Sequence, residues 1–190
     1  SLDTDPAWLA TAGQVHGSTV RVVDAPRHEP FCDGLVTTTP GLLLAIATAD
    51  CAAILLADPV NRVAGACHAG WRGAVARIAA DTVSTMVERG ADPNEIRAHV
   101  GPCISRAAFE VGPEVAAQFD DAFVHRKDDW PRPHVDLKGA LRRQLEEAGV
   151  PADTIELSER GTVQETDDFF SHRASGGTTG RMFGAVVLRN

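Results

Sequence analysis

Two short stretches of the chain place a thiol and an imidazole at the ends of apolar segments. Cys51 directly precedes the apolar run Ala52 to Ala57, and His68 directly follows the run Val63 to Cys67. The residues between the runs, Asp58-Pro59-Val60-Asn61, are of the types that favour a tight turn. If the two runs pair as a hairpin, both functional residues lie at the end away from the turn. The spacing therefore predicts that Cys51 and His68 meet.

A third candidate ligand lies near the start of the chain. His16 belongs to the stretch Gln14-Val15-His16-Gly17, which precedes a strand predicted at Val20 to Val23. Two imidazoles and one thiolate match the three-ligand pattern of catalytic zinc, which leaves a fourth position open. Spacing alone does not bring His16 to the other two residues. A cysteine that ends a buried strand is, moreover, most often a small core residue, so a structural role remains the alternative.

An arginine stands where a helix is predicted to begin. Apolar residues recur at three- and four-residue intervals from Val75 to Val87, which predicts one helix over Gly73 to Arg89 with Gly90 ending it. Arg72, just before this helix, combines a planar cation with the free N–H groups of a helix start, an arrangement suited to phosphate or carboxylate. The alternative is that Arg72 pairs with a surface carboxylate while Trp71 fills the core.

Asp50 is a further candidate because it adjoins the Cys51 thiol in the chain. Its carboxylate could orient a metal ligand or carry a proton for catalysis. A capping or turn role fits an Asp at the start of a strand equally well.

The remaining pattern predicts an α+β fold with a mixed sheet. Asp136 is expected to cap a helix through Ala148, and Pro113 to begin a shorter one through about Phe119. Several steps between predicted strands are too short for a crossover helix, so part of the sheet must be antiparallel. Besides the two hairpin runs, the predicted strands are Val20 to Val23, Leu42 to Ala47, Ala98 to Val100, Thr154 to Leu157 and Met182 to Leu188.

Composition limits the classes of function. The 190 residues, 44% of them hydrophobic, fit a single domain over 1–190. A net charge of -8 without a large Lys/Arg cluster argues against a nucleic-acid surface. No apolar run could span a bilayer and the first residues do not read as a signal peptide, so a cytoplasmic protein is expected. Four scattered cysteines then favour reduced thiols. The oligomeric state is not indicated.

Taken together, the motifs resemble those of the YfiH-like family, also called the laccase-domain or polyphenol oxidase family. The resemblance extends from about Gln14 to Leu188 and is strongest in the ordered pair TADC and CHAGWRG. The other segments that carry it are QVHG, the segment Asp33 to Thr37, GPCIS, FEVGPEV, FFSHR and TGRM.

The resemblance implies a layered α/β sandwich with mixed sheets and a zinc ion (Zn2+) bound by His16, Cys51 and His68. It further implies phosphorolysis of adenosine, inosine, guanosine and methylthioadenosine, with adenosine deamination as a second activity. The partners would then be a purine nucleoside and phosphate. Family members usually carry a further N-terminal stretch, and many have a Cys-Thr pair and a Tyr where this chain has Gly161-Thr162 and His172.

Three other functions stay open at this point. Copper-dependent polyphenol oxidation is the older family label, but the seven histidines include no His-x-His pair to serve as ligands of a copper cluster. Cys51 and His68 could instead be the nucleophile and base of a hydrolase. The third is editing of peptidoglycan precursors, which the name of some relatives implies.

His172 and Arg173 are expected to line the site, and Cys32, Cys67 and Cys103 to be core or loop thiols.

Overall fold

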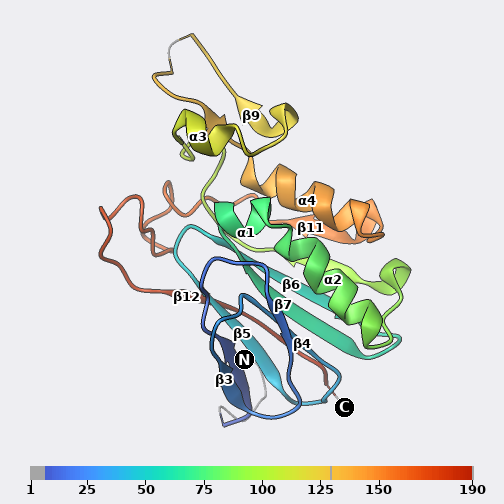
Figure 1. The fold of residues 1–190 in the computed structure, drawn as a ribbon. Helices are drawn as coiled ribbons and strands as arrows, with labels where there is room; N and C mark the ends of the chain where they lie inside the picture. Colours follow the sequence, from blue (N-terminus) through green and yellow to red (C-terminus); the bar gives the residue numbers. More distant parts are fainter. Residues whose placement is uncertain (1–6, 129, 190) are drawn as a thin grey trace.

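Three layers make up the structure. The computed structural model describes residues 7–128 and 130–189. In Figure 1 the helices α2 and α4 cover one face of a sheet that contains β6 and β7, and a second sheet with β5 and β12 lies on the other side. The predicted α+β class with mixed sheets is confirmed.

The larger sheet has six strands in the order β11-β8-β6-β7-β4-β2. The pairs β8–β6, β6–β7 and β7–β4 are antiparallel, whereas the outer pairs β11–β8 and β4–β2 are parallel. Its strands are β2 (Val20–Val22), β4 (Gly34–Thr37), β6 (Ala52–Asp58), β7 (Val63–Ala69), β8 (Arg97–Val100) and β11 (Ile155–Leu157).

The smaller sheet has four strands in the order β12-β5-β1-β3. Strand β1 runs parallel to both neighbours, and β12 runs antiparallel to β5. The strands are β1 (Leu9–Ala12), β3 (Arg27–Glu29), β5 (Leu43–Thr48) and β12 (Met182–Val187), and a separate ribbon pairs β9 (Val124–His125) with β10 (His134–Val135).

The helices are short. The two longest, α2 (Ile78–Glu88) and α4 (Leu137–Glu147), pack on the larger sheet, and Asp136 caps α4 by accepting the Gly139 N–H. None of the helices in the described residues is long and apolar enough to cross a membrane. The others are α1 (Trp71–Val75), α3 (Pro113–Ala116) and the 3-10 turns η1 (Pro93–Glu95), η2 (Asp121–Phe123) and η3 (Ala152–Thr154).

The single helix predicted over Gly73 to Arg89 is wrong. The segment forms α1 and α2, separated at Arg77, whose φ of 66° is left-handed. The apolar spacing continues across this break because Ala74 on α1 and Ile78 and Val83 on α2 all enter the same core. A periodic pattern reports the buried face and cannot register one residue that leaves the helical conformation.

The alternation of side chains along the central hairpin separates two cores. Ile54 on β6 and Cys67 on β7 belong to the core under the helices, whereas Ala53 and Ala66 belong to the core between the two sheets. His68 follows Ala66 by two residues, so its side chain lies on the face directed at the smaller sheet. The hairpin thus delivers His68 into the space between the sheets.

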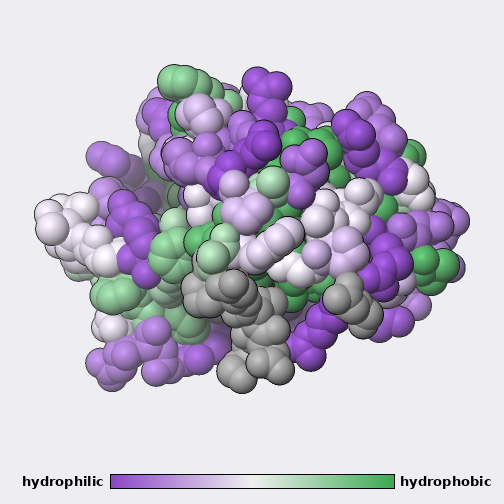
Figure 2. Space-filling model, turned by 90° about the horizontal axis from the view of Figure 1, so that it is seen from below, coloured by the Kyte–Doolittle hydropathy of each residue, from purple (hydrophilic) through white to green (hydrophobic). Residues whose placement is uncertain are grey.

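The surface is mixed in character. Figure 2 shows hydrophilic and hydrophobic residues interspersed over the face seen from below. Among the exposed large hydrophobic side chains, Phe31, Val60 and Phe183 lie in separate parts of the sequence. Single exposed apolar residues of this kind are normal for a protein surface.

The predicted hairpin is confirmed, and a buried carboxylate holds its turn. Ala53 pairs with His68 and Asp58 pairs with Val63. Asp58 Oδ1 accepts the N–H groups of Val60 and Asn61 at 2.9 and 2.8 Å, and Oδ2 accepts the Asp92 N–H at 2.8 Å. Since a shift of one residue in a hairpin reverses the faces, this turn fixes which face His68 occupies.

Replacing Asp58 with Asn is expected to lower the free energy of unfolding by about 2 kcal/mol at neutral pH, because a side-chain N–H2 then faces backbone donors. Burial alone would raise the pKa of Asp58, but hydrogen bonds from Asn61, Asp92 and Val60 bring it below 3.8. A lowered folded-state pKa gives stability that is present above the ordinary value and lost as the pH falls through the folded-state value.

Urea unfolding at several pH values measures this effect. The difference between the native chain and Asp58→Asn should be constant near neutrality and shrink below about pH 4. Asp24→Asn is the control because the Asp24 side chain is 84% exposed and should change little. A difference that is independent of pH down to pH 2 would contradict the role of the charge.

Candidate active site

A cavity of about 560 Å³ opens at the ends of the two sheets. Four residues singled out from the sequence line it, namely His16, Asp50, Cys51 and His68, and so do His172 and Arg173, as expected. Arg72 is not among the lining residues. The remaining wall is formed by Ala12, Gly13, Gln14, Ala47, Thr48, Ala49, Gly70, Trp71, Ile104, Phe109, Leu137 and Arg181.

Cys51 and His68 meet as the hairpin predicted. The register that pairs Ala52 with Ala69 places Cys51 beside Gly70, and the Cys51 side chain lies close enough to His68 to raise the pKa of its imidazole. A Cβ atom on Gly70 would lie 2.9 Å from the Cys51 sulfur. The absence of a side chain at Gly70 therefore leaves the space that the thiol occupies.

A buried carboxylate, that of Asp33, organises the loop that carries His16. Asp33 Oδ2 accepts the N–H groups of Val15 and Gly17 at 3.1 and 2.8 Å, and Oδ1 accepts the His16 N–H at 2.9 Å. Gln14 and His16 have φ values of 57° and 64°. Left-handed residues of this kind turn successive N–H groups toward one point, which makes an anion-binding concavity. Here Asp33 of the same chain fills it.

Asp33 also fixes the orientation of His68. The His68 Nδ1 atom lies 2.9 Å from Asp33 Oδ1, and both side chains are almost completely buried. With Nδ1 engaged, Nε2 is the nitrogen left for the cavity. A carboxylate behind an imidazole is the usual device that orients a metal-binding or catalytic histidine.

The electrostatics of this group follow from its contacts. Burial lowers the pKa of His68, but hydrogen bonds to Asp33 and Cys51 outweigh that effect and raise it to about 9. Burial raises the pKa of Asp33, but the bonds from His68, Gly17 and His16 lower it below its ordinary value. In the metal-free chain, His68 thus carries a proton that a metal ion would displace.

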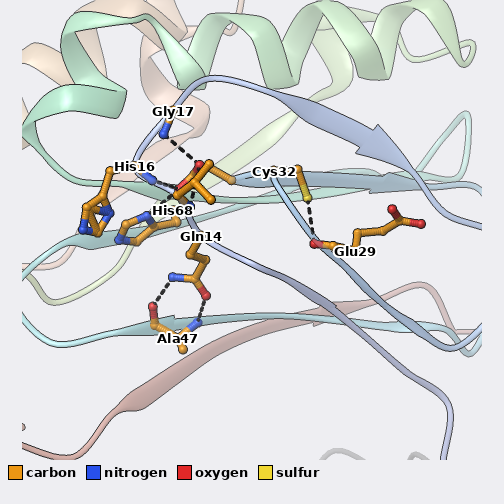
Figure 3. Close-up of polar contacts among 9 residues, drawn as sticks. Gln14, His16, Gly17, Glu29, Cys32, Ala47 and His68 are labelled. Atoms are coloured by element: carbon orange, nitrogen blue, oxygen red, sulfur yellow. Dashed lines mark hydrogen bonds and ion pairs between the residues drawn. The ribbon is translucent and has the colours of Figure 1, made fainter.

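His16 completes a close pair of imidazoles. Its ring centroid lies 4.8 Å from that of His68, and Figure 3 shows the two rings side by side. Burial and the neighbouring His68 lower the pKa of His16, which favours the neutral, metal-binding form. Gln14, on the same loop, bonds both the N–H and the carbonyl of Ala47 on β5, at 2.9 and 2.5 Å. The loop is thereby tied to the smaller sheet.

The closest group of candidate metal ligands in the described residues is His16, Asp33 and His68, whose ligand atoms lie within 4.8 Å of one another. The sequence interpretation did not single out Asp33 as a site residue. The sequence signal for Asp33 is that it begins the segment Asp33 to Thr37, one of the segments that resemble the family. Because both Asp33 oxygens already accept two hydrogen bonds each, the carboxylate has little capacity left for a metal. Cys51 lies next to His68 and, like it, lines the cavity.

The two charged candidates lie differently from each other. Asp50 is buried, and its carboxylate accepts hydrogen bonds from Thr162 and from the Arg173 backbone. Arg72 is exposed, and its guanidinium lies 4.4 Å from the centroid of the Trp71 ring. It is nevertheless close enough to His16 to lower the pKa of that imidazole. The helix that Arg72 helps to begin, α1, has only five residues.

The other thiols are structural, as predicted. Cys32, Cys67 and Cys103 are each fully buried. Burial raises the pKa of both Cys67 and Cys103 to about 12, so these thiols stay protonated at neutral pH. Only the fourth cysteine of the chain, Cys51, lines the cavity.

Solved structures with the same fold indicate the class of protein. YfiH from Bacillus licheniformis matches with a TM-score of 0.90 at 32% identity, over 99% of this chain and 77% of its own. YlmD from Geobacillus stearothermophilus matches with a TM-score of 0.88 at 33% identity, over 97% of this chain and 74% of its own.

The sequence comparison gives the family. The family model described as a multi-copper polyphenol oxidoreductase laccase matches residues 1–189, and the chain belongs to this family. The expected YfiH-like resemblance is confirmed.

Curated relatives carry names of nucleoside enzymes. A purine nucleoside phosphorylase of Deinococcus radiodurans is 47% identical over 185 residues, which cover 95% of this chain and 70% of the relative. One of Streptomyces coelicolor is 40% identical over 193 residues, covering 99% and 78%. A protein named adenosine deaminase RL5, from an unknown prokaryotic organism, is 39% identical over 178 residues, covering 89% and 68%.

Asp33→Asn should disrupt both the His16 loop and His68. Four hydrogen-bond donors point at the Asp33 carboxylate, and the N–H2 group of Asn would itself be a donor facing some of them. We therefore expect the free energy of unfolding to fall by about 3 kcal/mol or more. Urea denaturation measures the loss. The control is Asp121→Asn, since the Asp121 side chain is 89% exposed. Equal stability of Asp33→Asn and the native chain would refute the organising role of Asp33.

Proposed function

We propose that this chain is a zinc-dependent purine nucleoside phosphorylase acting on adenosine, inosine, guanosine and methylthioadenosine, with adenosine deaminase as a second activity. The observation that carries the proposal is the Cys51–His68–His16 group in one wall of an apolar-lined cavity. The names of the relatives support the same reaction.

The cavity suits a nucleoside. Its volume of about 560 Å³ lies within the usual range of small-molecule sites, ~300–1,000 Å³. Apolar side chains for a flat base come from Trp71, Ile104, Phe109 and Leu137. Polar groups for the ribose come from His172 and Arg181 in the same wall.

The donor set fits zinc. We assign the ligands as His16, Cys51 and His68, because two nitrogens and a thiolate suit zinc and Asp33 is saturated by hydrogen bonds. The space beside Gly70 admits the sulfur, and Asp33 presents Nε2 of His68. A zinc ion bound there would supply a Lewis acid and would lower the pKa of a water molecule in the site.

The chain's own residues account for binding of phosphate. The exposed guanidinium of Arg72 lies against Trp71, which lines the cavity, so it can approach an anion at the cavity mouth. A planar guanidinium can bond two phosphate oxygens at once. Phosphate held in this way would be oriented for attack on the ribose carbon as the purine leaves. We therefore propose Arg72 as the phosphate-binding residue.

Copper-dependent oxidation of phenols fits the residues less well. The family model carries a multi-copper description, but a cluster of coppers needs several groups of imidazole ligands. The described residues provide one group of candidate ligands, with two histidines in it. Copper could occupy this single site, but the ligands of a multi-copper cluster are not found in that part of the chain.

A Cys-His hydrolase is the second candidate, and one observation favours it. Cys51 lies next to His68, whose Nδ1 is bonded to Asp33, and this is the order of a nucleophile, a base and an orienting carboxylate. Such an enzyme would keep its activity in a chelator. The zinc enzyme would lose activity in a chelator and regain it with zinc.

One prediction of the proposed function concerns metal content. Purified protein should hold about one zinc per chain by elemental analysis, and occupancy should be lost in Cys51→Ser and His68→Ala and weakened in His16→Ala, because a three-ligand site cannot easily spare a member. Cys32→Ser is the matched control, since Cys32 is buried in the core between the sheets. Full occupancy in Cys51→Ser would show that Cys51 is not a ligand.

Another prediction of the proposed function concerns the reaction. With inosine, the zinc-loaded protein should form hypoxanthine and ribose 1-phosphate only when phosphate is present, whereas conversion of adenosine to inosine should not need phosphate. Separation of the products by chromatography measures both reactions. Arg72→Ala should raise the KM for phosphate about tenfold or more and leave deamination nearly unchanged.

Two results would count against these assignments. An equal loss of both reactions in Arg72→Ala would indicate a structural role at the start of α1. Unchanged nucleosides with zinc fully loaded would refute the proposed activity, and editing of peptidoglycan precursors would then be tested with the same protein.

A further inference from the structure

Asp50 joins three segments that are distant in the sequence. Its Oδ1 accepts the Thr162 hydroxyl at 2.6 Å, and its Oδ2 accepts the Arg173 N–H at 2.6 Å. Its backbone carbonyl accepts the Ile104 N–H at 2.8 Å. Thr162 is fully buried and Asp50 nearly so. Hydrogen bonds to a buried carboxylate are among the stronger ones in proteins, so this junction is firmly held.

The contacts continue from Arg173 to the cavity wall. The Arg173 guanidinium donates to the carbonyl of Ala108 at 3.2 Å and to that of Glu110 at 3.1 Å. These two residues flank Phe109, which lines the cavity, and His172, next to Arg173, lines it too. Asp50 is thus connected through Arg173 to both side chains.

The segment from His172 to Gly180 has few other attachments. In the described part of the chain, the hydrogen bonds that join this segment to anything outside residues 171–181 all come from Arg173. At its end, Gly180 lies against the ring of Phe170. The bond between Asp50 and the Arg173 N–H is therefore a principal anchor of the segment.

We propose that Asp50 is a positioning residue that holds His172 and Phe109 in place as the nucleoside-binding wall of the cavity. The identity of the ligand as a nucleoside rests on the proposed function, whereas the positioning role rests on the hydrogen bonds of Asp50 and Arg173 alone. In this role Asp50 sets the affinity for the nucleoside. It neither carries a proton nor holds the metal ligand Cys51 in place.

Asp50→Gly tests the proposal without straining the backbone. Asp50 has a φ of 87°, a left-handed region that Gly adopts readily. The variant removes the acceptor of both the Thr162 hydroxyl and the Arg173 N–H. We expect the KM for inosine to rise about tenfold while kcat stays within about twofold and the zinc content is unchanged.

A measurement that needs no activity accompanies the kinetics. Hydrogen–deuterium exchange of peptides covering residues 168–181 should be faster in Asp50→Gly, and exchange in residues 63–69 should be unchanged. Thr162→Val is the matched control. It removes one bond to Asp50 and leaves the Arg173 anchor, so its KM and exchange should stay near those of the native chain.

Arg173→Ala provides the test if Asp50→Gly does not fold. It keeps the backbone bond to Asp50 but releases the carbonyls that flank Phe109, so the KM for inosine should again rise with kcat retained. Loss of zinc from Asp50→Gly with unchanged exchange at residues 168–181 would overturn the proposal, because Asp50 would then act on Cys51. Unchanged KM and unchanged exchange would overturn it as well.

The outcomes separate this proposal from the proposed function. Faster exchange in Asp50→Gly, together with a zinc-loaded native chain that leaves nucleosides unchanged, would support the positioning role and refute the nucleoside assignment. A native chain that is active, with no kinetic change in Asp50→Gly, would support the function and refute the positioning role.

Discussion

The site depends first on a buried negative charge, the carboxylate of Asp33. A buried carboxylate is costly unless donors surround it, and here three backbone N–H groups and one imidazole do so. The backbone donors belong to the loop after β1 in the smaller sheet, and the imidazole belongs to β7 in the larger one. Satisfying this one charge therefore aligns the ends of the two sheets, and His16 and His68 come together as a result.

Asp50 plays a complementary part on the other side of Cys51. Asp33 orients the His68 imidazole and the loop that carries His16, whereas the contacts of Asp50 lead away from them, to Thr162 and to Arg173. The two carboxylates therefore hold different parts of the cavity wall in place. The Asp33 carboxylate is not free to act as a general base, because each of its oxygens already accepts two hydrogen bonds.

The sequence predicted the parts of this site that are local and missed those that are not. The contact of Cys51 with His68 could be predicted because a turn and two apolar runs lie between them. Pairing of the two runs as a hairpin places both residues at the end away from the turn. Asp33 meets His68 across 35 positions, and Asp50 meets Thr162 across 112. No periodicity reports such contacts. Strand β3, with the sequence Arg-His-Glu, was missed because a polar strand at a sheet edge carries no apolar signal.

The local charge of the cavity differs from that of the chain as a whole. The chain carries a net charge of -8, yet three basic side chains, those of His68, Arg173 and Arg181, belong to residues that line the cavity. They outnumber the one acidic residue in the same wall, Asp50. Because a cleft focuses the field of the groups that line it, a small anion meets a positive environment here despite the acidic surface. The choice of ligand is therefore set by the few residues that Asp33 and Asp50 hold in place, not by the composition of the protein.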